Sequence, residues 1–305
     1  MWSKFKHQTT LHVIIFIWGF TAILGKFIEA DAFVLVWYRV VLAFISLFLF
    51  LVLLRKPIRI DSIKKTLFTL TVGVIVAMHW LFFYLSIKES TASLAIICLS
   101  TATLHVAWLE PMIMKRKALK SEFFLGLIII AGILLITFRG SSDEINGLAI
   151  FYGLLAAFLA ALFSTLNAKL VQTVSASKIT LYEMFSASII MSIVLLIYKG
   201  LSVETLTITN KDFLLLLFLG IICTSVAFLV TVEITKFLGA FTVSLSINME
   251  PIYTLGLAAW LLHEHKELNL DFYLGATIIV GAVFANAFLK ARIRKRKNSV
   301  RQSAV

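Results

Sequence analysis

Polar and aromatic side chains that can bind a small solute lie inside long apolar stretches of this sequence. The candidates for lining a solute cavity are Trp18, His79, Trp80, Tyr84, Thr101, His105, Asn167, Asn248 and Glu250. A charged group at the centre of a membrane helix costs about 2.5–3.5 kcal/mol, so such groups are retained for pairing or for moving a solute. We therefore expect a polar cavity within an apolar protein.

The spacing of these residues places several of them on common helix faces. His79 and Phe83 stand at positions i and i+4, as do Thr101 and His105, and residues at this spacing share one face of a helix. Such a stripe either lines a water-filled path or forms hydrogen bonds between helices, worth about 0.6 kcal/mol each. For any single Ser, Thr or Asn, the interhelical bond is the favoured interpretation. Arg39 can pair across the bundle or extend to the outer headgroups, and the sequence favours the headgroups.

The residues that can change charge within these stretches are Glu250, Glu233, His79 and His105. Burial alters the proton affinity of a carboxylate, and a histidine titrates near neutral pH without help. If transport is coupled to protons, we expect one of these residues to carry the proton, whereas uniport needs none of them. Glu250 also precedes Pro251, whose ring leaves a backbone carbonyl unpaired that a substrate can meet. The alternative role of Glu250 is to accept hydrogen bonds near the cytoplasmic side.

The elements that must position these residues are long apolar segments. The chain has 305 residues, of which 60% are hydrophobic and 14% charged, whereas about a quarter of an average soluble domain is charged. A helix crosses a hydrocarbon core of about 30 Å in about 20 residues. Segments of that length lie at 10–28, 33–54, 67–87, 92–114, 122–138, 147–168, 177–198, 213–235, 240–262 and 272–290. They predict an all-α polytopic membrane protein with ten transmembrane helices.

The positive charges are distributed unevenly among the connections between these segments. The net charge is +12, and most Lys and Arg residues fall in alternate connections and in the tail at 291–305. The positive-inside rule therefore predicts that both termini are cytoplasmic and that the chain is a multi-pass protein of the inner, or plasma, membrane. Nucleic-acid binding is excluded because no aromatic-interleaved basic module or Gly-rich phosphate loop accompanies the basic tail.

The two halves of the chain resemble each other. Gly126 and Gly132 in the fifth segment match Gly275 and Gly281 in the tenth, and Arg39 aligns with Glu183. An odd number of spans per half inverts the second copy, as the exchange of basic for acidic connections also indicates. We expect two inverted five-helix repeats at 10–138 and 147–290, followed by the basic cytoplasmic tail. Inverted repeats are typical of secondary transporters that work by alternating access.

Several short motifs carry a resemblance to a known family. They are Trp18-Gly19, Arg39, Asn248-Met249-Glu250-Pro251, Glu264 and the Gly275/Gly281 pair. With these, the chain resembles the drug/metabolite transporter superfamily, specifically its ten-span EamA-type branch. The resemblance implies cytoplasmic termini, a central cavity, and efflux or exchange of amino acids or other small metabolites. The first half departs from the family pattern, with Ala102 and Lys115 where the pattern has proline and glutamate.

Functions of other classes find less support in the sequence. A membrane enzyme or sensor would need a clustered nucleophile, metal set or carboxylate pair, and His263-Glu264-His265 lacks the spacing that places two imidazoles on one helix face. We therefore expect no enzyme activity, no metal and no cofactor. A channel is the other alternative, and it would pass solute without saturation. The expected partners are a small-molecule substrate and the lipid bilayer, and the sequence leaves open whether the chain forms homo-oligomers.

Overall fold

The fold is described by a computed structural model, which defines residues 2–115, 147–200, 202–238, 249–266 and 268–302 and, between them, positions 124, 128, 131, 132, 135, 243, 246 and 247. All regular elements in these ranges are helices. They are α1 (Trp2–Phe27), α2 (Ala32–Leu53), α3 (Ile63–Glu89), α4 (Ala92–Ser100), α5 (Ala102–Ile113), α7 (Gly147–Leu170), α8 (Ala176–Tyr198), α9 (Val203–Leu206), α10 (Asn210–Leu217), η1 (Phe218–Val226), α11 (Ala227–Leu238), α13 (Glu250–Leu257), η2 (Ala258–Leu262), η3 (Glu264–Lys266) and α14 (Leu270–Gln302).

Among the described residues, seven helical segments are long and apolar enough to cross a membrane. They are α1, α2, α3, the α4–α5 pair, α7, α8 and the run from α10 through η1 into α11. The prediction of an all-helical polytopic membrane protein is confirmed. The predicted span at 122–138 and the first part of the one at 240–262 lie largely outside the described residues.

Side-chain caps fix where several of these helices begin. Asp31 accepts hydrogen bonds from the backbone N–H groups of Phe33 and Val34 at the start of α2, and Thr91 accepts one at the start of α4. Asp and Thr are favoured at this position because they satisfy N–H groups that have no partner within the helix. The starts of α2 and α4 are therefore fixed by their own capping residues.

Besides the span predicted at 240–262, which ends in the π-helix η2, two predicted spans are not regular α-helices. The span predicted at 92–114 is divided at Thr101 into α4 and α5, and the hydroxyl of Thr101 donates to the Cys98 carbonyl at 2.6 Å. The span predicted at 213–235 contains the π-helix η1, in which the Thr224 hydroxyl donates to the Leu219 carbonyl at 2.8 Å. Neither feature changes the hydrophobic pattern, so the sequence did not reveal them.

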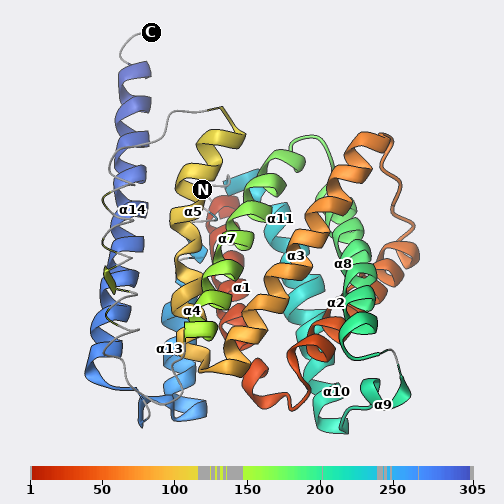
Figure 1. Cartoon of the computed structure of the whole chain (residues 1–305). Helices are drawn as coiled ribbons and strands as arrows, with labels where there is room; N and C mark the ends of the chain where they lie inside the picture. Colours follow the sequence, from red (N-terminus) through yellow and green to blue (C-terminus); the bar gives the residue numbers. More distant parts are fainter. Residues whose placement is uncertain are drawn as a thin grey trace.

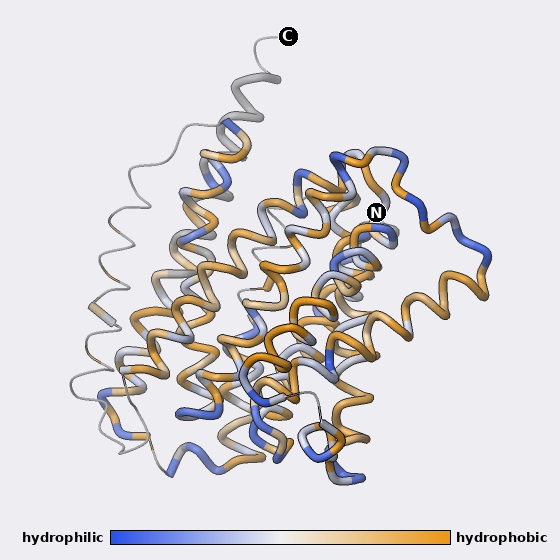
Figure 2. Tube along the Cα trace, turned by 45° about the vertical axis from the view of Figure 1, so that its right-hand side comes forward, coloured by the Kyte–Doolittle hydropathy of each residue, from blue (hydrophilic) through white to orange (hydrophobic). Residues whose placement is uncertain are grey.

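The helices form one bundle in which α3 packs against both α7 and α8 (Figure 1). Gly73 permits the close approach of α3 to α8, since a Cβ atom there would lie 2.5 Å from the Glu183 backbone oxygen. On the other side, α1 packs against α11 and α13. Apolar residues run along the helices and polar residues gather near their ends (Figure 2). Exposed side chains such as Leu53, Ile197 and Trp260 are thus suited to lipid.

Candidate functional site

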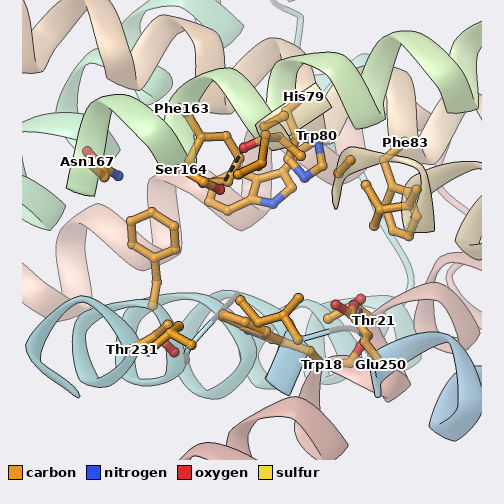
Figure 3. A pocket seen from close by; sticks show the side chains of 18 of the residues that line it. Trp18, Thr21, His79, Trp80, Phe83, Phe163, Ser164, Asn167, Thr231 and Glu250 are labelled. Atoms are coloured by element: carbon orange, nitrogen blue, oxygen red, sulfur yellow. Dashed lines mark hydrogen bonds between the residues drawn. The ribbon is translucent and has the colours of Figure 1, made fainter. Parts of the chain in front are cut away.

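A cavity of about 230 Å³ lies in the middle of the bundle. One wall is made by α3 and α7 and the opposite wall by α1, α11 and α13 (Figure 3). Aromatic rings supply much of the lining, namely Trp18, Trp80, Phe83, Phe163 and Phe228. The volume is below the roughly 300–1,000 Å³ of pockets that hold drug-sized ligands, so it suits a small metabolite.

Five of the sequence-predicted residues line this cavity. They are Trp18, His79, Trp80, Asn167 and Glu250. In Figure 3, Trp18 and Glu250 lie on one wall, and His79, Trp80 and Asn167 on the other. The structure thus brings together side chains from helices far apart in the sequence, while their role in substrate binding stays a prediction.

The remaining predicted residues are placed elsewhere. Tyr84 and Thr101 are buried outside the lining, and His105 packs against the rings of Trp108 and Phe158. Glu233 is exposed on α11 and is not part of the lining. Asn248 lies outside the described residues.

The wall that carries Trp18 and Glu250 is held by contacts between α1 and its neighbours. The indole N–H of Trp18 donates to the Cys223 carbonyl at 3.0 Å, within the π-helix η1. Pro251 lies in the first turn of α13. The N–H groups of a first turn have no partner within the helix, so a proline there costs no helical hydrogen bond. Glu250 therefore begins a helix at the edge of the cavity with its side chain buried.

Arg39 lines the cavity, so the expectation that it reaches the outer headgroups is wrong. Its side chain is only 3% exposed. Its Nε donates to the Thr224 hydroxyl at 2.8 Å and its Nη1 donates to the Tyr84 hydroxyl at 3.1 Å. The guanidinium carbon lies 4.1 Å from the centre of the Trp80 ring, a cation–π contact. These contacts stabilise the positive charge of Arg39 inside the bundle, so the side chain need not extend to the headgroups to be solvated.

The π-helix and Tyr84 explain how Arg39 is positioned. A π-helical turn shifts the residues that follow it, and such turns occur often at functional sites; here it presents Thr224 to Arg39. Tyr84 in turn donates to the Thr21 carbonyl at 3.2 Å. Tyr84 was expected in the lining. It lies outside the lining instead, and its hydroxyl orients Arg39, which is a lining residue.

On the opposite wall, His79 and Asn167 are each hydrogen-bonded. The Nδ1 of His79 donates to the Ala156 carbonyl at 2.9 Å, joining α3 to α7. The Nδ2 of Asn167 donates to Glu183 Oε2 at 3.3 Å. Sequence reasoning did not select Glu183, although its alignment with Arg39 in the predicted internal repeat was the signal that could have found it.

Hydrogen bonds and ion pairs join neighbouring segments at the end of the bundle where α1 ends, here called the far end. Asp212 accepts from the backbone N–H groups of Glu29 and Ala30 at 3.0 Å, and Glu264 accepts from those of Ala92 and Ser93 at 2.9 and 3.0 Å. Further contacts at this end are Lys26 to the Ser90 carbonyl, Lys88 to the Ile28 carbonyl, and the ion pairs Lys199–Asp31 and Lys211–Glu29.

The lining of the cavity extends in the other direction, toward the end where α1 begins. It includes Val171, just after α7, and Thr235 near the end of α11, and Ser164 is exposed. The described lining thus reaches toward the end of the bundle that holds the N-terminus of α1, while hydrogen bonds join the described segments at the far end.

Helices long and apolar enough to cross a membrane thus surround a cavity lined by aromatic rings, the Arg39 guanidinium and the Glu250 carboxylate. The model of the EamA-like transporter family matches residues 10–138 and 147–288. The chain belongs to this family.

Comparisons with individual proteins agree with this membership. The chain is 23% identical over 247 residues to the "Uncharacterized transporter YdfC" of Bacillus subtilis (strain 168), which covers 81% of this chain and 78% of that protein. It also shares its fold with a solved structure titled "Crystal structure of protein". The TM-score is 0.65 and the identity 13%, and the match covers 94% of this chain and 98% of the other. The chain is thus a membrane transporter of the EamA-like family.

Proposed function

We propose that this protein is a secondary transporter that exports or exchanges small zwitterions, foremost amino acids with apolar side chains, by alternating access. The observation that carries the proposal is the presence of Arg39 and Glu250 in one cavity whose lining is otherwise largely apolar and includes five Trp and Phe rings. A zwitterion presents a carboxylate and an ammonium group, which these two residues complement. Its apolar part would contact the rings.

The hydrogen bonds of Arg39 leave it capacity for a ligand. A guanidinium has five N–H donors, and the contacts with Thr224 and Tyr84 use one from Nε and one from Nη1. Its remaining donors, held in a planar fork, match the two oxygens of a carboxylate, and such charge-assisted pairs are about twice as strong as neutral ones. Because Thr224 and Tyr84 fix the side chain, little further ordering is needed on binding.

Two features support alternating access: the hydrogen bonds at the far end, and a cavity whose lining reaches toward the opposite end. With ten spans in two inverted repeats of 10–138 and 147–290 and both termini cytoplasmic, the far end would face outward and the cavity would be open inward. Rocking of the repeats would then break the contacts of Asp212 and Glu264 and expose the cavity on the outer side of the inner membrane. A channel needs no end that opens and closes in alternation, and the family matched by this chain is described as a transporter family, so transport by a carrier is the better account.

Binding of simple probes to the purified chain tests the proposed substrate class. L-leucine, L-phenylalanine and L-methionine should each raise the melting temperature of the detergent-solubilised protein. Analogues of leucine that lack the carboxylate or the ammonium group should bind at least tenfold more weakly, since loss of a charged hydrogen-bonding partner costs about 1.5–3 kcal/mol. Equal binding of leucine and both analogues would contradict zwitterion recognition.

A further inference from the structure

A buried carboxylate outside the cavity lining, that of Glu183 on α8, has few partners. Its side chain is fully buried. Oε2 accepts one hydrogen bond, of 3.3 Å, from Nδ2 of Asn167, and Oε1 has no hydrogen-bond partner. An ionised carboxylate in such surroundings is costly unless it is paired, and it loses its charge when it takes up a proton.

Among the described residues around Glu183, none is paired with it as a counter-ion. Helix α8 packs against α2, α3 and α11, and Asn167 belongs to α7. Besides Glu183, the ionisable side chains on these five helices are Tyr38, Arg39, Lys64, Lys65, His79, Tyr84, Lys88, Glu89, Tyr152, Lys169, Lys178, Tyr182, Tyr198, Glu233 and Lys236. Within the described part of these helices, none forms an ion pair with Glu183. Arg39, the buried cation, is engaged by Thr224 and Tyr84.

Asn167 links Glu183 to the cavity. It lines the cavity and is itself buried, and its Oδ1 has no hydrogen-bond partner. An amide can donate through nitrogen or accept through oxygen. Asn167 can therefore donate to an ionised Glu183 through Nδ2, as in this structure, or accept from a protonated Glu183 through Oδ1 after its amide group turns over.

These two arrangements have opposite consequences for a substrate. When Glu183 is ionised and holds Nδ2, the oxygen of Asn167 is buried without a hydrogen-bond partner, and a small rotation of the side chain would present it to the ammonium group of a zwitterion in the cavity. When Glu183 is protonated, that oxygen turns to Glu183, and the amide nitrogen, which cannot accept from an ammonium group, takes its former place. Proton and substrate would thus be bound in alternation.

We propose that Glu183 is the proton-binding residue that couples this carrier to a proton gradient, with Asn167 as the positioning residue that makes proton and substrate exclude each other. The proposal rests on the proposed function. One proton adds to the Glu183 carboxylate on one side of the membrane and leaves on the other, with substrate moving in the opposite direction. No other reactant is needed.

Proteoliposomes that contain the full chain test this assignment with a labelled mixture of L-leucine, L-phenylalanine and L-methionine. With an acidic interior and a neutral exterior, the native protein should accumulate label above the external concentration. Glu183→Gln should retain counterflow at equal pH within about twofold, because Gln can both donate to and accept from Asn167. It should lose the pH-driven accumulation entirely. Glu204→Gln, which changes an exposed glutamate on α9, should behave as the native protein.

The outcomes separate this inference from the proposed function. Full pH-driven accumulation by Glu183→Gln would overturn the assignment, as would native accumulation driven by a sodium gradient and not by pH. Absence of counterflow by the native protein would instead contradict the proposed function itself.

Two further measurements apply if Glu183→Gln does not fold. Glu183→Asp retains a carboxylate and should keep pH-driven accumulation, and loss of that accumulation by a folded Glu183→Asp would count against the assignment. In the native chain, a hydrophobic carbodiimide, which reacts with protonated carboxylic acids, should modify Glu183 more at pH 6 than at pH 8, as located by mass spectrometry. No modification at either pH would overturn it.

Discussion

At the scale of single residues, the proposed binding chemistry depends on Arg39. Its bonds to Thr224 and Tyr84 and its contact with Trp80 hold a positive charge beside an aromatic cavity. A carboxylate bound there would gain a charge-assisted hydrogen bond in surroundings with little water, where such bonds are strong. Arg39 is therefore the residue whose change should affect substrate binding most.

Replacement of Arg39 by Gln tests this role. A hydrogen bond to a charged group is worth about 1.5–3 kcal/mol, and about 1.4 kcal/mol corresponds to a tenfold change in affinity. We expect Arg39→Gln to weaken leucine binding by about ten- to a hundredfold, measured by calorimetry. Arg39→Lys should recover only part of the loss because an ammonium group lacks the planar fork. Arg59→Gln, at an exposed position, should bind as the native protein does, and an unchanged affinity in Arg39→Gln would refute the assignment.

The residues of the cavity were only partly predictable. Trp18, His79, Trp80, Asn167 and Glu250 could be selected because polar or amphipathic residues stand out within apolar segments. The partners of Arg39 could not be found in this way, since Thr224 and Tyr84 come from other helices and meet it only in the folded bundle. The same holds for the pair of Asn167 and Glu183.

At the scale of elements, the hydrophobic pattern gave the positions of the long helices but not their interruptions. The residues of η1 and those around Thr101 are of the same apolar and hydroxylated types as in a regular membrane helix. What distinguishes them is the tertiary bond of Thr224 and the local bond of Thr101, which hydropathy does not record.

The hydrogen bonds of Glu264 at the far end can be tested by substitution. Glu264 is 3% exposed and accepts from two backbone N–H groups at the start of α4. An unsatisfied buried N–H costs about 1–3 kcal/mol. Glu264→Ala should therefore raise hydrogen exchange at the amides of Ala92 and Ser93 by about tenfold or more, measured by mass spectrometry.

The matched control for this change is Glu29→Ala at the same end. The side chains of Lys211 and Glu29 are 59% and 67% exposed, and exposed ion pairs contribute about 0–1 kcal/mol. Exchange at Ala92 and Ser93 should then stay close to that of the native protein. Equal exchange in the two variants would show that Glu264 does not close this end.

At the scale of the whole molecule, the proposed orientation can be tested by cysteine labelling. Cys98 and Cys223 are buried, so the native chain should resist a membrane-impermeant maleimide. Ser202→Cys, at the far end, should be labelled in intact cells, whereas Arg59→Cys, between α2 and α3, should be labelled only after permeabilisation. The reverse pattern would place the termini outside and contradict the positive-inside interpretation.

The overall class of the molecule was predictable because long apolar segments in a lipid bilayer have few stable arrangements. The size and lining of the cavity were not, since they depend on how side chains of α1, α3, α7, α11 and α13 meet. The hydrogen bonds of Asp212 and Glu264 at the far end were not predictable either, because they join segments that are far apart in the sequence.

Counterflow most directly tests the central claim that this chain is an alternating-access carrier. Proteoliposomes loaded with unlabelled leucine, phenylalanine and methionine are diluted into a trace of the labelled mixture, and internal label is followed with time. A carrier should produce a transient accumulation of label above the external concentration that saturates with internal substrate and is lost in Arg39→Gln. Label that only equilibrates, at a rate proportional to concentration, would contradict the account.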